Sequence, residues 1–133
     1  MKIACLQFNA RLGAVQHNID RANVLLHSIK PSQLDILVLP ELAFSGYNFP
    51  DLESIKPFLE PTTSGPTTQW AITIAKRLSC TVIVGYPEVN VGTDGRTRNY
   101  NSTVSVYGPT QPNATGTLGW FDSVVPRSVN SSL

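Results

Sequence analysis

The chain has 133 residues, of which 41% are hydrophobic and 14% charged. This length and composition fit one modest folded domain and exclude a wholly disordered chain. A formal net charge of +1 gives no indication of binding to nucleic acid or to an anionic membrane surface. No run of about 18 apolar residues occurs, so no membrane-spanning helix is expected.

The first half of the chain predicts alternating strands and helices. A nearly continuous apolar run at 3–8 is typical of a strand buried on both faces, and apolar residues at helical spacing follow at 19–29. A second apolar run at 36–39 predicts another buried strand, which ends at Pro40 and is followed by Glu41. A long connection over 44–61 then leads to a helix that begins near Pro66.

The second half predicts one more strand and a hairpin. A third apolar run lies at 81–85, a polar turn containing Asp94-Gly95 lies at 92–98, and alternating residues follow at 102–107. The order βαβαββ predicts an α/β fold with a mixed sheet and helices packed on it. We expect one domain over 1–107 and a low-complexity, disordered tail over 108–133, which is rich in small and polar residues.

Glu41 is the first candidate for chemistry because it directly follows a buried strand. Ligands gather outside the carboxyl ends of strands in open α/β sheets, and a carboxylate placed there can transfer protons. The alternative is that Glu41 starts a loop or caps a short helix, and the spacing leaves both interpretations open.

The other reactive residue types indicate packing. Cys5 lies within an apolar strand and is expected to be buried, whereas Cys80 joins a helix to a strand and is expected to pack in the core or at its boundary. His17 and His27 lack metal-ligand spacing, and no glycine-rich phosphate loop occurs, so no metal or cofactor is expected. Without a signal-peptide pattern, we expect an intracellular protein of the cytoplasm or nucleus, with reduced thiols.

Short motifs are spread over 1–107: Ala4, Gln7, Gly13, Asn18, 37–41 (Leu-Val-Leu-Pro-Glu), Gly46-Tyr47, Val84-Gly85, Glu88 and 99–102 (Asn-Tyr-Asn-Ser). Together they resemble the amino-terminal half of the carbon–nitrogen hydrolase (nitrilase) superfamily. The segment 41–50, together with 57–62, 65–66 and 70–71, is closer to one branch, the fungal protein N-terminal amidases. Enzymes of that branch deamidate asparagine or glutamine at protein N-termini and so feed the N-degron pathway.

The resemblance implies a four-layer α-β-β-α sandwich, of which this chain would supply one half, and a Glu-Lys-Cys catalytic set without metal or cofactor. Glu41 matches the family's general base, which takes the proton of the thiol that attacks the amide carbonyl. The lysine stabilises the oxyanion. By the same resemblance, Phe44, Tyr47 and Asn48 border a pocket for N-terminal Asn or Gln of a protein or peptide.

The family's lysine and cysteine have no match in this chain. The four lysines all precede the expected position, and neither cysteine lies where the nucleophile would. Because such residues act as a unit, we expect a truncated chain that is inactive alone and leaves one sheet face uncovered. One alternative is a non-catalytic fragment that pairs with a full-length relative through that face. The other is a generic small-molecule-binding α/β domain.

Overall fold

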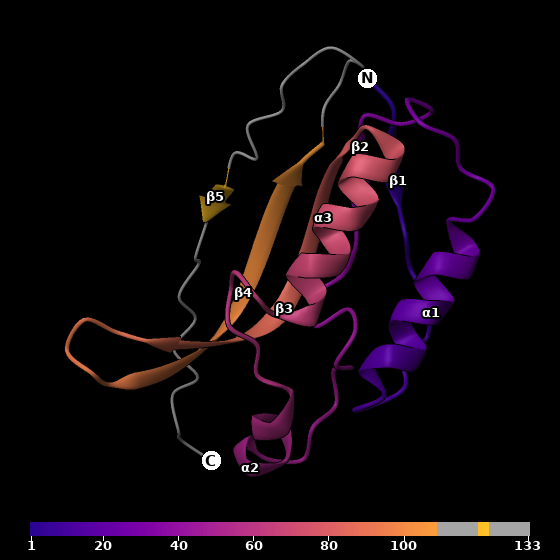
Figure 1. Ribbon diagram of the computed structural model, residues 1–133. Helices are drawn as coiled ribbons and strands as arrows, with labels where there is room; N and C mark the ends of the chain where they lie inside the picture. Colours follow the sequence, from indigo (N-terminus) through magenta and orange to yellow (C-terminus); the bar gives the residue numbers. More distant parts are fainter. Residues whose placement is uncertain (109–119, 123–133) are drawn as a thin grey trace.

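The computed structural model describes residues 1–108 and 120–122 (Figure 1). The strands in this part are β1 (Ile3–Cys5), β2 (Ile36–Val38), β3 (Thr81–Val91), β4 (Thr97–Tyr107) and β5 (Trp120–Asp122). The helices are α1 (Val15–Leu25), α2 (Leu52–Ile55) and α3 (Pro66–Leu78), and a 3-10 turn, η1, lies at Lys56–Phe58.

The strands form one mixed sheet in the order β1-β2-β3-β4-β5. Strands β1, β2 and β3 are parallel, whereas β4 runs antiparallel to both β3 and β5. The α/β fold with a mixed sheet is therefore confirmed. The Asp94-Gly95 turn also joins β3 to β4 as expected, with Gly95 at a positive φ of 72°, but both strands reach further toward this turn than the sequence indicated.

Strand β5 is an element that the sequence analysis missed. It lies within the segment expected to be a disordered tail, and its three residues pair with Val104, Ser105 and Val106 of β4. The remainder of that segment, 109–119 and 123–133, lies outside the described residues, so the expectation of disorder stays a prediction there.

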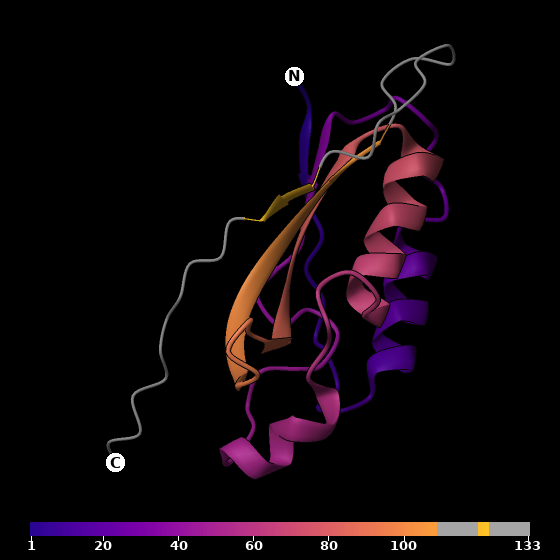
Figure 2. The same ribbon diagram turned by 60° about the vertical axis from the view of Figure 1, so that its left-hand side comes forward.

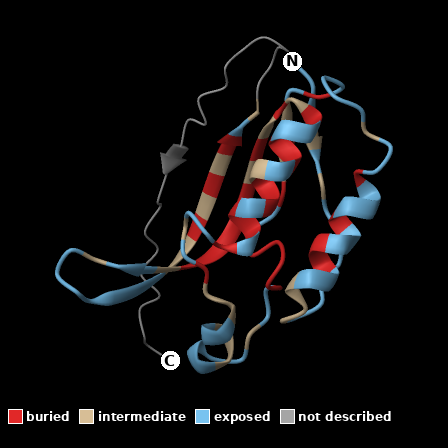
Figure 3. Cartoon of the chain, in the orientation of Figure 1, coloured by how far each residue is buried: buried red, intermediate tan, exposed pale blue. Residues whose placement is uncertain are grey.

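Helices α1 and α3 lie on the same face of the sheet, as the edge-on view of Figure 2 shows. Apolar residues at helical spacing build this packing, because they place one stripe of each helix against the strands. Figure 3 shows the resulting alternation of buried and less buried residues along β4. The larger side chains of this core include Leu37, Trp70, Ile74, Leu78, Val82, Val84, Val104 and Val106.

The opposite face, here called the open face, carries the side chains of Ile3, Cys5, Ile36, Val38, Ile83, Thr103 and Ser105. No helix or strand of the described residues covers it. Residues paired across a sheet project to the same side, and Cys5, Val38 and Ile83 form one such row. None of these three is fully buried, and Cys5 is exposed.

Two expectations are corrected by the open face. Burial of the first strands on both faces is wrong, and so is burial of Cys5. An apolar run in the sequence indicates that both faces suit burial, but it cannot say what supplies the second layer. The result agrees with the implication that this fold is one half of a sandwich.

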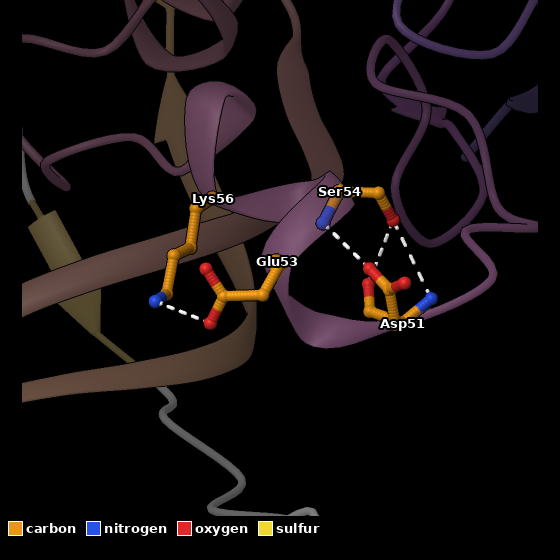
Figure 4. A network of polar contacts seen from close by, with 4 residues as sticks. All are labelled: Asp51, Glu53, Ser54 and Lys56. Atoms are coloured by element: carbon orange, nitrogen blue, oxygen red, sulfur yellow. Dashed lines mark hydrogen bonds and ion pairs between the residues drawn. The ribbon is translucent and has the colours of Figure 1, made fainter.

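The long connection between β2 and α3 contains a short helix that the sequence analysis assigned to a loop. Asp51 caps α2 by accepting a hydrogen bond from the Ser54 backbone N–H at 2.8 Å, and this bond lowers the pKa of Asp51. The Ser54 hydroxyl in turn accepts from the Asp51 N–H, which completes a capping box (Figure 4). Lys56 and Glu53 form an exposed ion pair on the next turn.

Candidate functional site

Glu41 follows β2 at its carboxyl end, where the chain stays paired with β3 for two more residues. The Leu39 N–H donates to the Ile83 carbonyl at 2.8 Å, and the Gly85 N–H donates to the Pro40 carbonyl at 3.3 Å. The backbone of Glu41 then passes directly over Gly85. A Cβ atom on Gly85 would lie 2.5 Å from the Glu41 Cα, so only glycine permits this approach.

The residue after Glu41 adopts a strained backbone conformation. Leu42 has a φ of +47°, a left-handed value that is uncommon for a side chain of this size. The hydrogen bond from the Ala43 N–H to the Gly85 carbonyl, at 3.1 Å, and the burial of 42–46 hold the turn in place. Strained residues of this kind cluster at functional sites, which favours a functional interpretation of the turn.

The Glu41 carboxylate lies on the open-face side of the sheet. Gly85 alternates along β3 with Val84 and Tyr86, which are buried beneath the helices, so the Glu41 backbone must pass on the other side. There the side-chain amide of Asn101 in β4 donates a hydrogen bond from Nδ2 to Glu41 Oε1 at 2.9 Å. Glu41 is thus held by neighbouring strands on both its backbone and its side chain.

A hollow of about 270 Å³ lies beside Glu41. Tyr47 lines it with a side chain that is 68% exposed, so Tyr47 lies where a pocket-lining residue was expected. Asn48 is exposed on the same turn but is not part of the lining. The residues around the hollow are Gln7, Phe8, Asn9, Ala10, Pro40, Glu41, Leu42, Ala43, Gly46 and Tyr47.

Phe44 is not part of this hollow. It is 1% exposed and lies in the core, where its ring stacks on Phe8 at 6.5 Å and meets Trp70 edge-on at 4.8 Å between centroids. The backbone turn at Leu42 points successive side chains to different sides, which the sequence does not reveal. Phe44 therefore packs the turn from below instead of bordering the hollow.

Asn18 supports the turn from helix α1, although the sequence analysis gave it no role. Its side chain is completely buried and donates from Nδ2 to the carbonyls of Phe44 and Arg11, both at 2.8 Å. Its Oδ1 accepts from the Arg11 N–H at 2.9 Å. An asparagine on the apolar stripe of a helix could have indicated this role, because a buried side-chain amide requires hydrogen-bond partners.

Two buried acids, Glu88 and Glu60, lie on the opposite side of the hairpin from Asn101. Glu88 accepts hydrogen bonds from the hydroxyls of Ser102 at 2.5 Å and Thr62 at 2.7 Å. Glu60 accepts from the backbone N–H and the hydroxyl of Thr67, at 2.9 and 2.8 Å. The Asn-Tyr-Asn-Ser motif thus serves two acids, since Asn101 binds Glu41 and Ser102 binds Glu88.

Burial raises the pKa of Glu60, partly offset by the hydrogen bonds from Thr67. The unfolded chain ionises Glu60 near 4.5, whereas the folded chain resists ionisation. The contribution of Glu60 to stability is therefore full below pH 4.5 and is lost as the pH rises through the folded pKa. We expect urea titrations between pH 4 and 7 to show this loss in the native chain and to show less of it in E60Q.

The exposed Glu53 provides the matched control for this experiment, since E53Q removes a carboxylate that is not buried. Its pH dependence is expected to follow that of the native chain. Equal pH dependence in E60Q and the native chain would show that burial of Glu60 does not govern this part of the curve.

Cys80 is unsuited to act as a nucleophile. Burial raises its pKa to about 11, against an ordinary value of 9.0, despite the opposing influence of Arg77. Cys5 is exposed and lines a neighbouring hollow of about 200 Å³, which shares Gln7 and Pro40 with the hollow at Glu41. Within the described residues, the side-chain hydrogen bond of Glu41 is with Asn101 and neither thiol takes part in it.

The two thiols are expected to react with iodoacetamide at very different rates. At neutral pH the raised pKa of about 11 leaves Cys80 with about a hundredfold less thiolate than its ordinary value of 9.0 would give, and Cys80 is also inaccessible, whereas Cys5 is exposed. Mass spectrometry after brief labelling should find the reagent on Cys5 and not on Cys80. Prompt labelling of Cys80 in the folded chain would contradict the burial described above, and C5S provides the control for assignment.

None of the lysines contacts Glu41 in the part of the chain that the structure describes. Lys56 pairs with Glu53 at 2.6 Å, and Lys76 lies on α3, behind the sheet. Lys2 lies just before β1, and Lys30 lies before β2, both far along the strands from the carboxyl ends. The described residues that line the hollow at Glu41 include no lysine, arginine or histidine.

Residues 1–108 and 120–122 provide neither a metal-binding cluster nor a membrane-spanning helix. These residues hold no group of three or more His, Cys, Asp or Glu side chains placed to bind a metal ion. Their helices are also too short or too polar to cross a membrane.

Comparison with known proteins identifies the family. The model of the carbon–nitrogen hydrolase family matches residues 2–113. The chain belongs to this family. The match extends over most of the described fold, so the resemblance drawn from the sequence motifs is confirmed.

The carbon–nitrogen hydrolases most similar to this chain include N-terminal amidases. The Protein N-terminal amidase of Schizosaccharomyces pombe is 40% identical over 110 residues, which cover 80% of this chain and 38% of that protein. The Protein N-terminal amidase of Saccharomyces cerevisiae is 31% identical and also covers 80% of this chain, but only 23% of its own length is matched. The chain thus spans well under half the length of these curated relatives.

Solved structures of N-terminal amidase share the fold. A structure with a bound Asn-Glu peptide superposes with a TM-score of 0.69 at 28% identity and covers 79% of this chain and 24% of that one. A structure with a Gln-Gly peptide gives a TM-score of 0.71 at 27% identity, with 90% and 27% covered. The described sheet and helices therefore match the amino-terminal part of the carbon–nitrogen hydrolase fold.

Proposed function

We propose that this chain supplies the general base of an amide hydrolase that deamidates asparagine or glutamine at the N-termini of proteins. The observation that carries this proposal is Glu41, held at the carboxyl end of β2 on the open face with one oxygen bound to Asn101. Its support is the similarity to N-terminal amidases, including structures named for bound Asn-Glu and Gln-Gly peptides.

The chemistry of such a site follows from the position of Glu41. The carboxylate takes the proton of a thiol, the thiolate attacks the side-chain amide carbon of the substrate, and a lysine stabilises the oxyanion. The carboxyl group then returns the proton to the departing ammonia, and water hydrolyses the thioester. The thiol and the lysine would have to come from polypeptide lying on the open face, since Glu41 faces that side.

The hollow beside Glu41 suits the small end of such a substrate. Gln7 supplies an amide that can exchange hydrogen bonds with a substrate amide, and Tyr47 supplies an exposed aromatic wall. The proposed substrates are protein or peptide N-termini that begin with Asn or Gln. The Asp or Glu product would serve as a degradation signal in an intracellular setting, the cytoplasm or nucleus.

Complementation in trans tests this function. We expect this chain, co-expressed with the part of the S. pombe amidase that follows the matched segment, to release ammonia from an Asn-initiated peptide and not from an Ala-initiated one. This chain alone should release none, because its described lysines do not reach Glu41. A stable complex of the two parts without any ammonia release would count against the proposed function, as would release by this chain alone.

A second candidate is a non-catalytic role in which the chain pairs with a full-length relative through the open face. The exposed Ile3 and Cys5 and the half-buried Val38 and Ile83 favour it, because uncovered apolar surface of this kind drives association. Light scattering distinguishes this role. Co-elution of this chain with the full-length relative would support pairing. A monodisperse monomer that does not bind the relative would contradict it.

A further inference from the structure

The hydrogen bond between Asn101 and Glu41 joins residues 60 positions apart in the chain. We propose that Asn101 is a positioning residue, which fixes the Glu41 carboxylate with Oε1 engaged and leaves Oε2 as the oxygen that exchanges the proton. The role rests on the proposed function, because it assigns a task within the same site. The bond itself can be tested independently of any activity.

The chemistry of the two side chains sets the direction of this bond. An ionised carboxylate only accepts hydrogen bonds, so the asparagine must present its Nδ2 donor to Glu41. Engagement of Oε1 lowers the tendency of that oxygen to take a proton, since its lone pair already faces an N–H group. A proton from a thiol would therefore arrive on Oε2, and the carboxylate would not need to rotate first.

The rigidity of β4 makes Asn101 suitable for this task. Asn101 lies within the long β3–β4 ladder, opposite Pro87, and its neighbour Ser102 is buried and bound to Glu88. The amide therefore projects from a strand that β3 holds through its backbone and through the neighbouring Ser102 side chain. Preorganised groups of this kind avoid the cost of orientation during the reaction.

The Asn101 amide also brings no net charge to Glu41. An arginine or lysine at this position would hold the carboxylate equally well, but its positive charge would stabilise the ionised form and make Glu41 a weaker base. An amide orients the group while adding no net charge. This choice fits an acid that must alternate between its protonated and ionised forms.

A purely structural role predicts different behaviour. The backbone at Glu41 is already fixed by its close approach to Gly85 and by the hydrogen bonds of Leu39 and Ala43. Loss of the side-chain bond should therefore release the carboxylate and leave the turn in place. Asn101→Leu removes the donor at nearly constant volume, and Asn99→Leu is its matched control on the same side of the same strand, where Asn99 is exposed.

Nuclear magnetic resonance of this chain provides the test. In the native chain, we expect the Asn101 side-chain amide protons to move downfield as the pH rises from acidic to neutral, because Glu41 becomes a stronger acceptor. The chemical shifts of the same protons should not change with pH in E41Q, and those of the Asn99 side-chain amide should not change in either protein. In N101L, order parameters of the Glu41 methylene groups should fall, whereas N99L should leave them unchanged.

The outcomes separate the positioning role from its alternatives. Asn101 signals that do not move with pH, or that move equally in E41Q, would overturn the proposal. So would an N101L variant that keeps Glu41 as ordered as in the native chain, or one that unfolds while N99L does not. These measurements need no substrate, so absence of amidase activity would leave the bond supported and would count only against the proposed function.

Discussion

Gly85→Ala should displace Glu41 and destabilise the fold by about 3 kcal/mol, because the new methyl group has no space. The added Cβ would lie 2.5 Å from the Glu41 Cα and 3.1 Å from the Pro40 carbonyl oxygen. Both obstacles are backbone atoms of a segment that is hydrogen-bonded to β3, so they cannot rotate away as a side chain would. The midpoint temperature of thermal unfolding should fall by roughly 10 °C or more for a domain of this size.

Gly92→Ala is the matched control for this substitution. Its Cβ would meet the far end of Arg98 and the side chain of Asp94, which are flexible and exposed. We therefore expect Gly92→Ala to change the midpoint of unfolding much less than Gly85→Ala. If the two variants unfold at the same temperature, the close approach of Glu41 to β3 is wrong.

Phe44→Ala should cost about 4 kcal/mol of folding stability, since it removes a fully buried ring. Phe44 joins the turn after Glu41 to the helix layer through its contacts with Phe8 and Trp70. The cavity left behind lies beneath the turn, so Glu41 should also lose order. Urea unfolding followed by tryptophan fluorescence measures the first effect, because Trp70 lies beside the site of substitution.

Tyr47→Ala is the natural comparison, because it removes an aromatic ring from the same turn. Tyr47 is exposed, so this variant should stay within about 0.5 kcal/mol of the native chain. The two residues were both predicted to border a pocket, and the structure separates them. A small effect of Phe44→Ala, or an equal effect of Tyr47→Ala, would contradict that separation.

The sequence predicted the elements that depend on local apolar periodicity and on residues that form turns or end strands. The apolar runs that become β2 and β3, the stripe of α3 and the Asp94-Gly95 turn each follow from spacing along the chain. The position of Glu41 after β2 was predicted for the same reason, since Pro40 ends the apolar run. Its role as a base stays a prediction.

The remainder depended on contacts between distant segments. The apolar character of Cys5's neighbours indicated burial, but exposure is decided by whether a second layer covers the sheet. The side of the turn on which the Phe44 ring lies depends on the left-handed backbone conformation of Leu42. A leucine gives no signal in the sequence for that conformation. The bond from Asn101 to Glu41 requires β2 and β4 to flank β3 in a defined register, and the register of β2 against β3 joins segments far apart in the chain.

The most direct test of the account is ammonia release by a chimera in which residues 2–108 of this chain replace the matched segment of the S. pombe amidase. The account predicts that the chimera deamidates an Asn-initiated peptide and that E41Q within it lowers the rate at least about a hundredfold with little change in peptide binding. An active chimera whose E41Q variant keeps its rate within a few fold would contradict the claim that Glu41 is the general base.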